Sequence, residues 1–310
     1  MTPLYILSGP TAVGKTEISI KLAKKLNAEI ISADSIQVYR HMDIGSAKIL
    51  PEEMQGVRHH LIDILEPTEP FDVAEFVKLG KAAVKEIVGR GKIPLIVGGT
   101  GFYLHALIYD NDFSDGAKDS AYREALEREA ADPYNDLYER LKTVDPASYE
   151  AIPKGNMKRV IRALEFYHVT GKRISDHNRE EREKKSPYDL NFYVLTLPRH
   201  LLYDRINSRV DMMTEKGLFE ETERLISLGV KQEMTSMQGL GYKQAYLYFK
   251  GLYTKEEAID AIKKETRHFA KRQLTWFRKE KEAVFIDKSL FDGDEEIVRF
   301  IYEKGGQNEG

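Results

Sequence analysis

The chain has 310 residues and a mass of 35.6 kDa, which is enough for about two domains of ~150 residues each. Apolar residues make up 42% and charged residues 31%, a globular balance that argues against disorder and fibrous repeats. The formal net charge of -3 gives no indication of nucleic-acid binding, and the absence of cysteine excludes disulfides, thiolate zinc sites and a cysteine nucleophile. The N-terminus does not resemble a signal peptide and no apolar run approaches the ~18 residues of a membrane span, so we expect a cytoplasmic protein without a membrane partner.

The first hundred residues alternate between short apolar runs and helical patterns. The apolar runs lie at Pro3–Ser8, Ala28–Ser32, His60–Leu65 and Ile93–Val97. One helical pattern begins at Lys15, and another runs from the capping residue Asp72 to about Gly89. Short buried strands that alternate with helices predict an α/β fold with a doubly wound parallel sheet.

The pattern changes near residue 110. Residues 107–150 contain twelve acidic and five basic residues, and their apolar spacing is helical. We therefore predict a helical insertion at 115–186, between a core segment at 1–114 and a returning segment at 187–310. In the returning segment we expect strands at Asn191–Leu197 and Ala283–Asp287, a helix from about His200 to Gly217 or Gly229, a helix opened by Thr254 and ending near Lys281, and a terminal helix.

A phosphate-binding loop follows the first predicted strand. Its residues fit the pattern G-x-x-x-x-G-K-[ST]: Gly9, Pro10, Thr11, Ala12, Val13, Gly14, Lys15 and Thr16. Backbone N–H groups and the start of the following helix favour phosphate oxygens, Lys15 adds a positive charge, and the Thr16 hydroxyl can ligate Mg²⁺. The loop predicts a polyphosphate ligand on a P-loop NTPase-like sheet, with Mg²⁺ as the cofactor.

The other motifs of common nucleotide hydrolases are missing. No asparagine is followed by lysine, so the guanine-reading Asn-Lys-x-Asp motif is absent. The strand at Ile93–Val97 ends in Gly98-Gly99-Thr100 instead of a carboxylate that would support Mg²⁺. A motor or switch NTPase is therefore not expected, whereas a small-molecule kinase stays possible.

Two polar positions are expected to converge with the phosphate loop. Asp34 and Thr100 each follow a predicted strand, and ligands of doubly wound sheets lie beyond the carboxyl ends of the strands. Asp34 could accept a proton or a hydrogen bond from an acceptor substrate, or it could cap the next helix. Convergence with Thr100 favours the functional interpretation.

Basic residues supply further candidates. Arg205 and Arg209 share one face of a predicted helix, where they either bind phosphate or remain solvated. Residues 154–173 and 262–281 are two basic clusters, which fit either a polyanion partner or solvated helix faces. We interpret Trp276 as a core residue and the adjacent His59 and His60 as structural.

The motifs in succession resemble the tRNA isopentenyltransferase family, in its bacterial members, over nearly the whole length of the chain. Besides the phosphate loop at 9–16, the matching stretches are Ser-Ala-Asp-Ser-Ile-Gln-Val-Tyr at 32–39, Met-Asp-Ile-Gly-Ser-Ala-Lys at 42–48, His-His-Leu-Ile-Asp at 59–63, Val-Gly-Gly-Thr-Gly at 97–101, Arg-Val-Ile-Arg-Ala-Leu-Glu at 159–165, Arg-Ile-Asn-Ser-Arg-Val at 205–210, Gly-Leu-Gly-Tyr-Lys at 239–243 and Ala-Lys-Arg-Gln-Leu-Thr-Trp-Phe-Arg at 270–278.

The resemblance implies transfer of a dimethylallyl group from dimethylallyl diphosphate to N6 of the adenosine 3′-adjacent to the anticodon in tRNA, with release of pyrophosphate. It implies that Asp34 is the base or hydrogen-bond acceptor at the amine, that Thr100 positions the adenine, and that Arg209, with Arg205, Lys15 and Mg²⁺ at Thr16, holds the diphosphate. The tRNA anticodon stem-loop would contact Asp34, Ser35, Ile36, Gln37, Thr100, Arg123, Lys158, Arg159, Arg162, Gln238, Gly241 and Lys243. No obligatory protein partner is evident.

Alternatives from other classes remain. A small-molecule kinase would transfer phosphate from ATP without RNA, and a non-catalytic RNA-binding protein would bind RNA whether or not Lys15 is present. Prenylation of a free adenine nucleotide is a related reaction, against which the long helical insertion argues.

Overall fold

The computed structural model describes residues 1–111 and 119–306. Over these residues the strands form one six-stranded, all-parallel sheet in the order β3-β2-β4-β1-β5-β6. The strands are β1 (Thr2–Ser8), β2 (Ala28–Ala33), β3 (His59–His60), β4 (Ile93–Gly98), β5 (Tyr188–Thr196) and β6 (Ala283–Asp287). The predicted α/β fold with a parallel sheet is confirmed.

Three strands end at the same level of the sheet. Ser8 at the end of β1 pairs with Gly98 at the end of β4, and Gly98 also pairs with Ala33 at the end of β2. A Cβ on Gly98 would lie 2.3 Å from the Ala33 carbonyl oxygen, so only glycine allows this close approach. The loops after β1, β2 and β4 therefore leave the sheet side by side.

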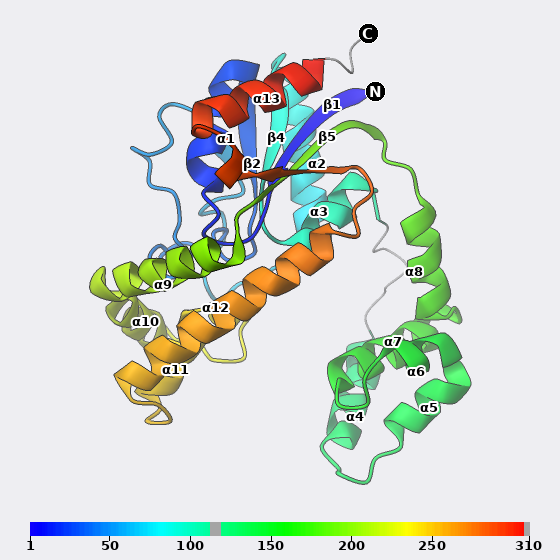
Figure 1. Cartoon of the computed structure of the whole chain (residues 1–310). Helices are drawn as coiled ribbons and strands as arrows, with labels where there is room; N and C mark the ends of the chain where they lie inside the picture. The colour runs from blue at the N-terminus through cyan, green and yellow to red at the C-terminus, as the bar shows by residue number, and fades with distance from the viewer. Residues whose placement is uncertain (112–118, 307–310) are drawn as a thin grey trace. The chain divides into compact units, whose positions relative to one another are not determined.

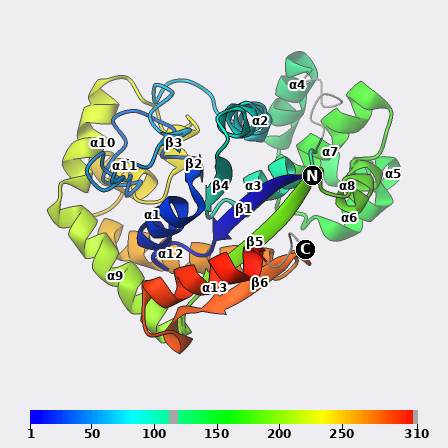
Figure 2. The same cartoon turned by 90° about the horizontal axis from the view of Figure 1, so that it is seen from above.

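Helices cover both faces of the sheet (Figures 1 and 2). Helices α1 (Lys15–Leu26) and α13 (Asp294–Gly306) lie together on one face, and α2 (Val73–Gly89) and α3 (Gly101–Ile108) lie on the other. The carboxylate of Asp72 accepts hydrogen bonds from two backbone N–H groups and caps α2, as predicted. Within the described residues, no helix is both long and apolar enough to cross a membrane.

The prediction of a strand at His60–Leu65 was wrong in extent. β3 contains only His59 and His60, because Leu61 and Asp63 adopt left-handed backbone conformations with φ of 63° and 54°. A strand cannot continue through such residues. Leu61 is buried without belonging to a strand, and Leu65 at the end of the run forms only an isolated parallel bridge with Tyr39.

A group of helices follows β5. It comprises α9 (Arg199–Glu215), α10 (Leu218–Ser227), the short 3₁₀ helix η1 (Ser236–Gln238), α11 (Tyr242–Phe249) and α12 (Lys255–Phe277). Gly217 has φ of 100° and separates α9 from α10, which decides between the two expected helix ends. Thr254 and Glu257 form the predicted reciprocal capping box of α12. A short 3₁₀ helix, η2 (Lys288–Leu290), follows β6.

The chain divides into two compact units, residues 1–107 with 187–310, and Ile108–Ser186. The second unit contains α4 (Ser120–Ala130), α5 (Leu137–Val144), α6 (Pro146–Ala151), α7 (Met157–Thr170) and α8 (Ile174–Glu183). Its own apolar core includes Leu126, Leu137, Leu141 and Val160. The boundary that we expected between residues 114 and 115 lies outside the described residues.

Candidate active site

The phosphate loop connects β1 to α1 in the conformation that its glycines permit. Gly9 and Gly14 have φ of 143° and 92°, in the region that other residues rarely adopt. A Cβ on Gly9 would lie 2.5 Å from the carbonyl oxygen of Leu195 in β5. Helix α1 begins at Lys15, so the backbone N–H groups of its first turn are available to an anion.

Lys15 is folded back onto its own loop. Its Nζ donates hydrogen bonds of 2.9 Å to the carbonyl oxygens of Gly9 and Pro10. The pKa of Lys15 is lowered to about 7, mainly by burial and secondly by the neighbouring charge of Arg209, while the charge of Asp34 acts in the opposite direction. These three side chains therefore lie within electrostatic reach of one another.

Asp34 directly follows β2 and is half-buried. Its Oδ1 accepts hydrogen bonds from the backbone N–H groups of Ile36 at 2.9 Å and Gln37 at 3.2 Å. Asp34 thus caps a turn, but no helix begins there, so the expectation that it caps the next helix was wrong. The same carboxylate also acts electrostatically on Lys15 and Arg209, so capping does not remove it from the site.

The two arginines of α9 differ in their surroundings. Burial lowers the pKa of Arg209, while the charge of Asp34 raises it. Arg205 is exposed, and its Nη1 donates a hydrogen bond of 3.4 Å to the carbonyl oxygen of Val13 in the phosphate loop. Neither arginine is a merely solvated surface residue.

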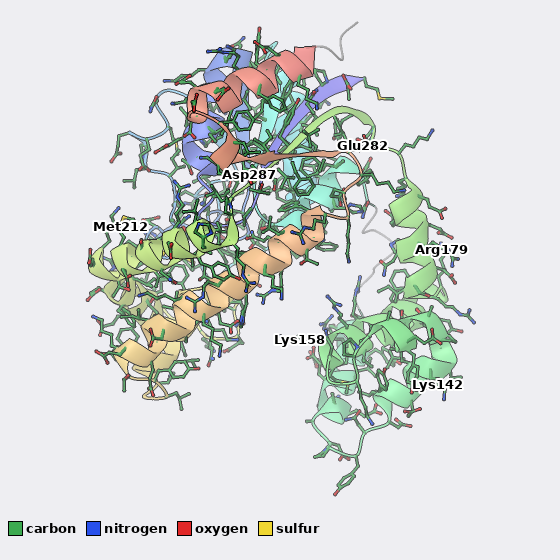
Figure 3. The ribbon with its side chains drawn as sticks, viewed as in Figure 1. Lys142, Lys158, Arg179, Met212, Glu282 and Asp287 are labelled. Atoms are coloured by element: carbon green, nitrogen blue, oxygen red, sulfur yellow. The ribbon has the colours of Figure 1, made fainter. Side chains whose placement is uncertain are left out.

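Lys288 is a cation beside the phosphate loop that the sequence did not indicate. It follows Asp287, the last residue of β6, which is labelled in Figure 3. Its Nζ lies 2.9 Å from the position of a Cβ on Gly14 and forms an ion pair of 2.9 Å with Asp294. Only the three-dimensional return of β6 to the sheet brings this lysine next to residue 14.

Thr100 follows β4 and is half-buried; its carbonyl oxygen accepts a hydrogen bond from Tyr103 at the start of α3. Gln273 of α12 packs against Gly99, the residue before Thr100. Its Nε2 donates a 2.8 Å hydrogen bond to the Gly99 carbonyl oxygen, and its Oε1 accepts one of 2.9 Å from the Thr11 backbone. Gln273 thus joins the phosphate loop to the loop after β4, a connection across 262 residues that we did not predict.

The residues after Asp34 contact a second segment of the same unit. The Gln37 amide donates long hydrogen bonds to the carbonyl oxygens of Ser46 at 3.3 Å and Ala47 at 3.4 Å. A Cβ on Gly239 would lie 3.1 Å from the Ile36 side chain. The expected nucleotide-contacting segments 35–37 and 238–243 are therefore neighbours. Within them Ser35 is half-buried, Gly241 has a positive φ of 94°, and Gln238 and Lys243 are exposed.

Four of the expected RNA-contacting residues belong to the second unit. Nη1 of Arg123 in α4 and Nη1 of Arg162 in α7 lie 3.1 Å and 3.3 Å from the same oxygen, Oε2 of Glu165, which is fully buried. Lys158 and Arg159 are exposed near the start of α7, where Lys158 is labelled in Figure 3. Two of the four cations, Arg123 and Arg162, are thus held by one buried acid, whereas Lys158 and Arg159 are exposed.

The basic helix α12 has mixed roles. Lys263 forms an ion pair of 2.5 Å with Asp211, and Arg267 donates a hydrogen bond to Asn207, so these two cations join α12 to α9. The ring of Trp276 lies against Gly101, where a Cβ would be 2.3 Å from it. Trp276 packs against Gly101 but is only half-buried, so it is not the core residue that we expected.

The histidine pair has structural contacts. His59 hydrogen bonds to the carbonyl oxygen of Val57, and His60 to the carboxylate of Glu29. Among the residues that the structure describes, no group of three or more histidine, aspartate or glutamate side chains is arranged to hold a metal ion.

Comparison with known proteins assigns the family. The model of a family described as IPP transferase matches residues 37–280. The chain belongs to the IPP transferase family. A tRNA dimethylallyltransferase from Lachnoclostridium phytofermentans is 49% identical over 309 residues, with 98% of this chain and 99% of the relative covered.

Solved structures of IPP transferase relatives have the same fold. Full-length tRNA isopentenylpyrophosphate transferase from Bacillus halodurans is 45% identical, with a TM-score of 0.76 and 100% and 98% of the two chains covered. The corresponding transferase from Staphylococcus epidermidis is 39% identical, with a TM-score of 0.74 and 99% and 100% covered. A eukaryotic dimethylallyltransferase acting on tRNA is 30% identical, with a TM-score of 0.80 over 93% of this chain and 74% of that chain. The resemblance inferred from the motifs is confirmed.

Proposed function

We propose that this chain transfers a dimethylallyl group from dimethylallyl diphosphate to N6 of the adenosine 3′-adjacent to the anticodon. The family and the 49% identity give the general activity: the protein is a prenyltransferase that acts on tRNA. The observation that supports the detailed assignment is the cluster of Lys15, Arg209 and Asp34, in which one carboxylate lies among cations. The cations can bind the diphosphate of the donor, and the carboxylate can accept a proton from the acceptor amine.

The donor would bind through its diphosphate. The N–H groups at the start of α1 would take the phosphate oxygens, and Lys15 would exchange the carbonyl oxygens of Gly9 and Pro10 for phosphate. Arg209 would stabilise the charge that develops on the leaving pyrophosphate, and Arg205 would add charge at the edge of the loop. Such a site needs no base-reading motif, in agreement with the missing NTPase signatures.

The transfer step replaces the C1–O bond of the donor with a bond from C1 to N6 of the adenine. N6 of the adenine attacks C1 of the dimethylallyl group, and the C1–O bond breaks with its electron pair remaining on pyrophosphate. The proton lost by N6 passes to Asp34. Because Oδ1 of Asp34 is occupied by two backbone N–H groups, we assign Oδ2 to the amine. Thr100, at the end of the adjacent strand, would position the adenine.

Magnesium fits the donor side of this site. The Thr16 side chain is exposed in the first turn of α1, directly after Lys15, and provides a hydroxyl ligand. Mg²⁺ takes few protein ligands and completes its shell with water and substrate phosphates, so one hydroxyl is a suitable anchor. When bound there with the diphosphate, the ion would neutralise part of its charge.

The acceptor would be an anticodon stem-loop whose target adenine leaves its stack to reach the donor, because a stacked base hides its amine. Ser35, Ile36 and Gln37 would line the path of the base. The remaining RNA contacts would come from Gln238, Gly241 and Lys243 and, in the second unit, from Arg123, Lys158, Arg159 and Arg162. Contacts with the phosphate backbone predict binding that weakens steeply with salt.

An acceptor assay tests the proposal. Protein, Mg²⁺ and labelled dimethylallyl diphosphate are mixed with an anticodon stem-loop that carries adenosine at the target position, with inosine there as the matched control. We expect label on the adenosine RNA alone and none on AMP. Transfer of phosphate from ATP to a small molecule, without prenylated RNA, would establish a kinase instead.

A further inference from the structure

A buried carboxylate connects two segments near Asp34. Glu221 of α10 is 2% exposed. Its oxygens accept hydrogen bonds of 2.9–3.1 Å from three consecutive backbone N–H groups, those of Asp43, Ile44 and Gly45. The hydroxyl of Tyr242, the first residue of α11, donates a further hydrogen bond of 2.6 Å to Oε1.

The backbone at 43–45 has the form of an anion-binding nest. Consecutive N–H groups that point to one side create a concentrated positive potential, which an anion satisfies. Here the anion is the carboxylate of Glu221, which occupies the nest in place of an external ligand. A Cβ on Gly45 would lie 2.6 Å from the Tyr242 ring, so the loop also packs directly against α11.

Both segments that Glu221 binds lie next to residues that we propose to contact the acceptor RNA. The carbonyl oxygens of Ser46 and Ala47, directly after the nest, receive the Gln37 amide. On the other side, Tyr242 lies between Gly241 and Lys243. Every hydrogen bond described for Glu221 goes to one of these segments, and none goes to the phosphate loop.

We propose that Glu221 is a positioning residue for the RNA substrate, which holds the segments at 35–47 and 238–243 in the arrangement that accepts the extruded adenine. This inference rests on the proposed function. Glutamine at this position keeps the shape of the side chain but presents an NH₂ group to N–H donors, so at least one buried donor loses its partner. The nest then relaxes, and Gln37 and Tyr242 shift with it.

Steady-state kinetics of Glu221→Gln test the inference, with the exposed neighbour Glu223→Gln on the same helix as the control. We expect the KM for the anticodon stem-loop to rise about tenfold, the order of effect expected when a buried donor loses its partner. The KM for dimethylallyl diphosphate should stay within about twofold, and the control should match the wild type. A purely structural role would not separate the two substrates.

Tyr242→Phe provides a second, milder test, because it removes the hydroxyl that bonds Glu221 and the Ser46 backbone but leaves the nest filled. Its KM for RNA should rise by a smaller factor, about threefold. An unchanged KM for RNA in both variants, or equal rises for both substrates, would overturn the inference while leaving the proposed function intact. If Glu221→Gln does not fold, the result with Tyr242→Phe decides. A wild-type protein that places no label on RNA would instead overturn the proposed function, and with it this inference.

Discussion

Asp34 binds the backbone with Oδ1, and its other oxygen, Oδ2, is the one that we assign to the acceptor amine. Its Oδ1 accepts the N–H groups of Ile36 and Gln37, which fixes the direction of the side chain. Its charge meanwhile acts on Lys15 and Arg209. The two interpretations that the sequence left open, a cap and a reactive group, are compatible in one residue. This division of labour allows the two contributions to be separated by mutation.

Asp34→Asn should keep the cap and lose the base. The asparagine Oδ1 can still accept the two backbone N–H groups, so the melting temperature should remain close to that of the wild type. The amide cannot take up the proton from N6, and kcat should fall by about 10²–10⁴-fold. Asp34→Ala should lose both turnover and the stabilisation of the turn. Turnover near the wild-type rate in Asp34→Asn would remove Asp34 from the reaction.

Lys15 predicts a pH dependence of donor binding. Its pKa of about 7 in the unliganded loop means that the side chain loses its charge as the pH rises above 7. A bound diphosphate favours the protonated form and raises the pKa, so affinity for dimethylallyl diphosphate should weaken between pH 7 and 9, by up to about tenfold per unit. Calorimetric titration at several pH values measures this. In Lys15→Arg, whose charge is permanent, the dependence should flatten; parallel profiles in both proteins would contradict the prediction.

Helix α12 connects two loops of the candidate site, the phosphate loop and the loop after β4. Gln273 connects the Thr11 backbone to the Gly99 carbonyl oxygen, and Trp276, one turn later, packs on Gly101. The succession of glycines after β4 is thus explained by the approach of a helix from the other end of the chain. In the sequence the same glycines show only that the strand ends without a carboxylate, because nothing local identifies their partner.

A double-mutant cycle tests this contact. A Cβ on Gly99 would lie 2.3 Å from Nε2 of Gln273, and Gly99 has no positive φ, so the cost of Gly99→Ala comes from displacing that amide. Gln273→Ala removes the obstacle together with the hydrogen bonds. The two substitutions should each lower the free energy of unfolding and be non-additive by about 0.5–3 kcal/mol. Urea unfolding of the four proteins gives the coupling, and simple additivity would show that the contact is not shared.

Across the molecule, local patterns predicted the elements well and long-range partners poorly. The phosphate loop, the caps Asp72 and Thr254 and most strands could be recognised because their signals lie within a few residues. Gln273 and Lys288 could not, since each meets the phosphate loop only after the chain has crossed the whole sheet. The error at His60–Leu65 has the opposite origin: the apolar pattern was present, but left-handed residues broke the strand.

Glu29 lies at the start of β2, at the end of the sheet opposite the candidate site, and its surroundings predict how stability changes with acid. Glu29 of β2 is 2% exposed. Burial alone would raise the pKa of Glu29, but hydrogen bonds from Arg90, His60 and Lys92 outweigh it and lower the pKa to about 2. The folded-state pKa is therefore below the ordinary value of 4.5, so the stabilisation is complete above pH 4.5 and is lost as the pH falls toward 2.

Glu29→Gln should accordingly be less stable than the wild type at pH 7, by about 3 kcal/mol, because Arg90, Lys92 and His60 lose the carboxylate that they share. The difference in free energy of unfolding should shrink as the pH is lowered from 4.5, since the wild type then loses the same charge. Urea titrations at pH 7 and in the acid range measure this difference, with the exposed Glu233→Gln as the control. A difference that stays constant with pH would mean that Glu29 contributes through packing and not through its charge.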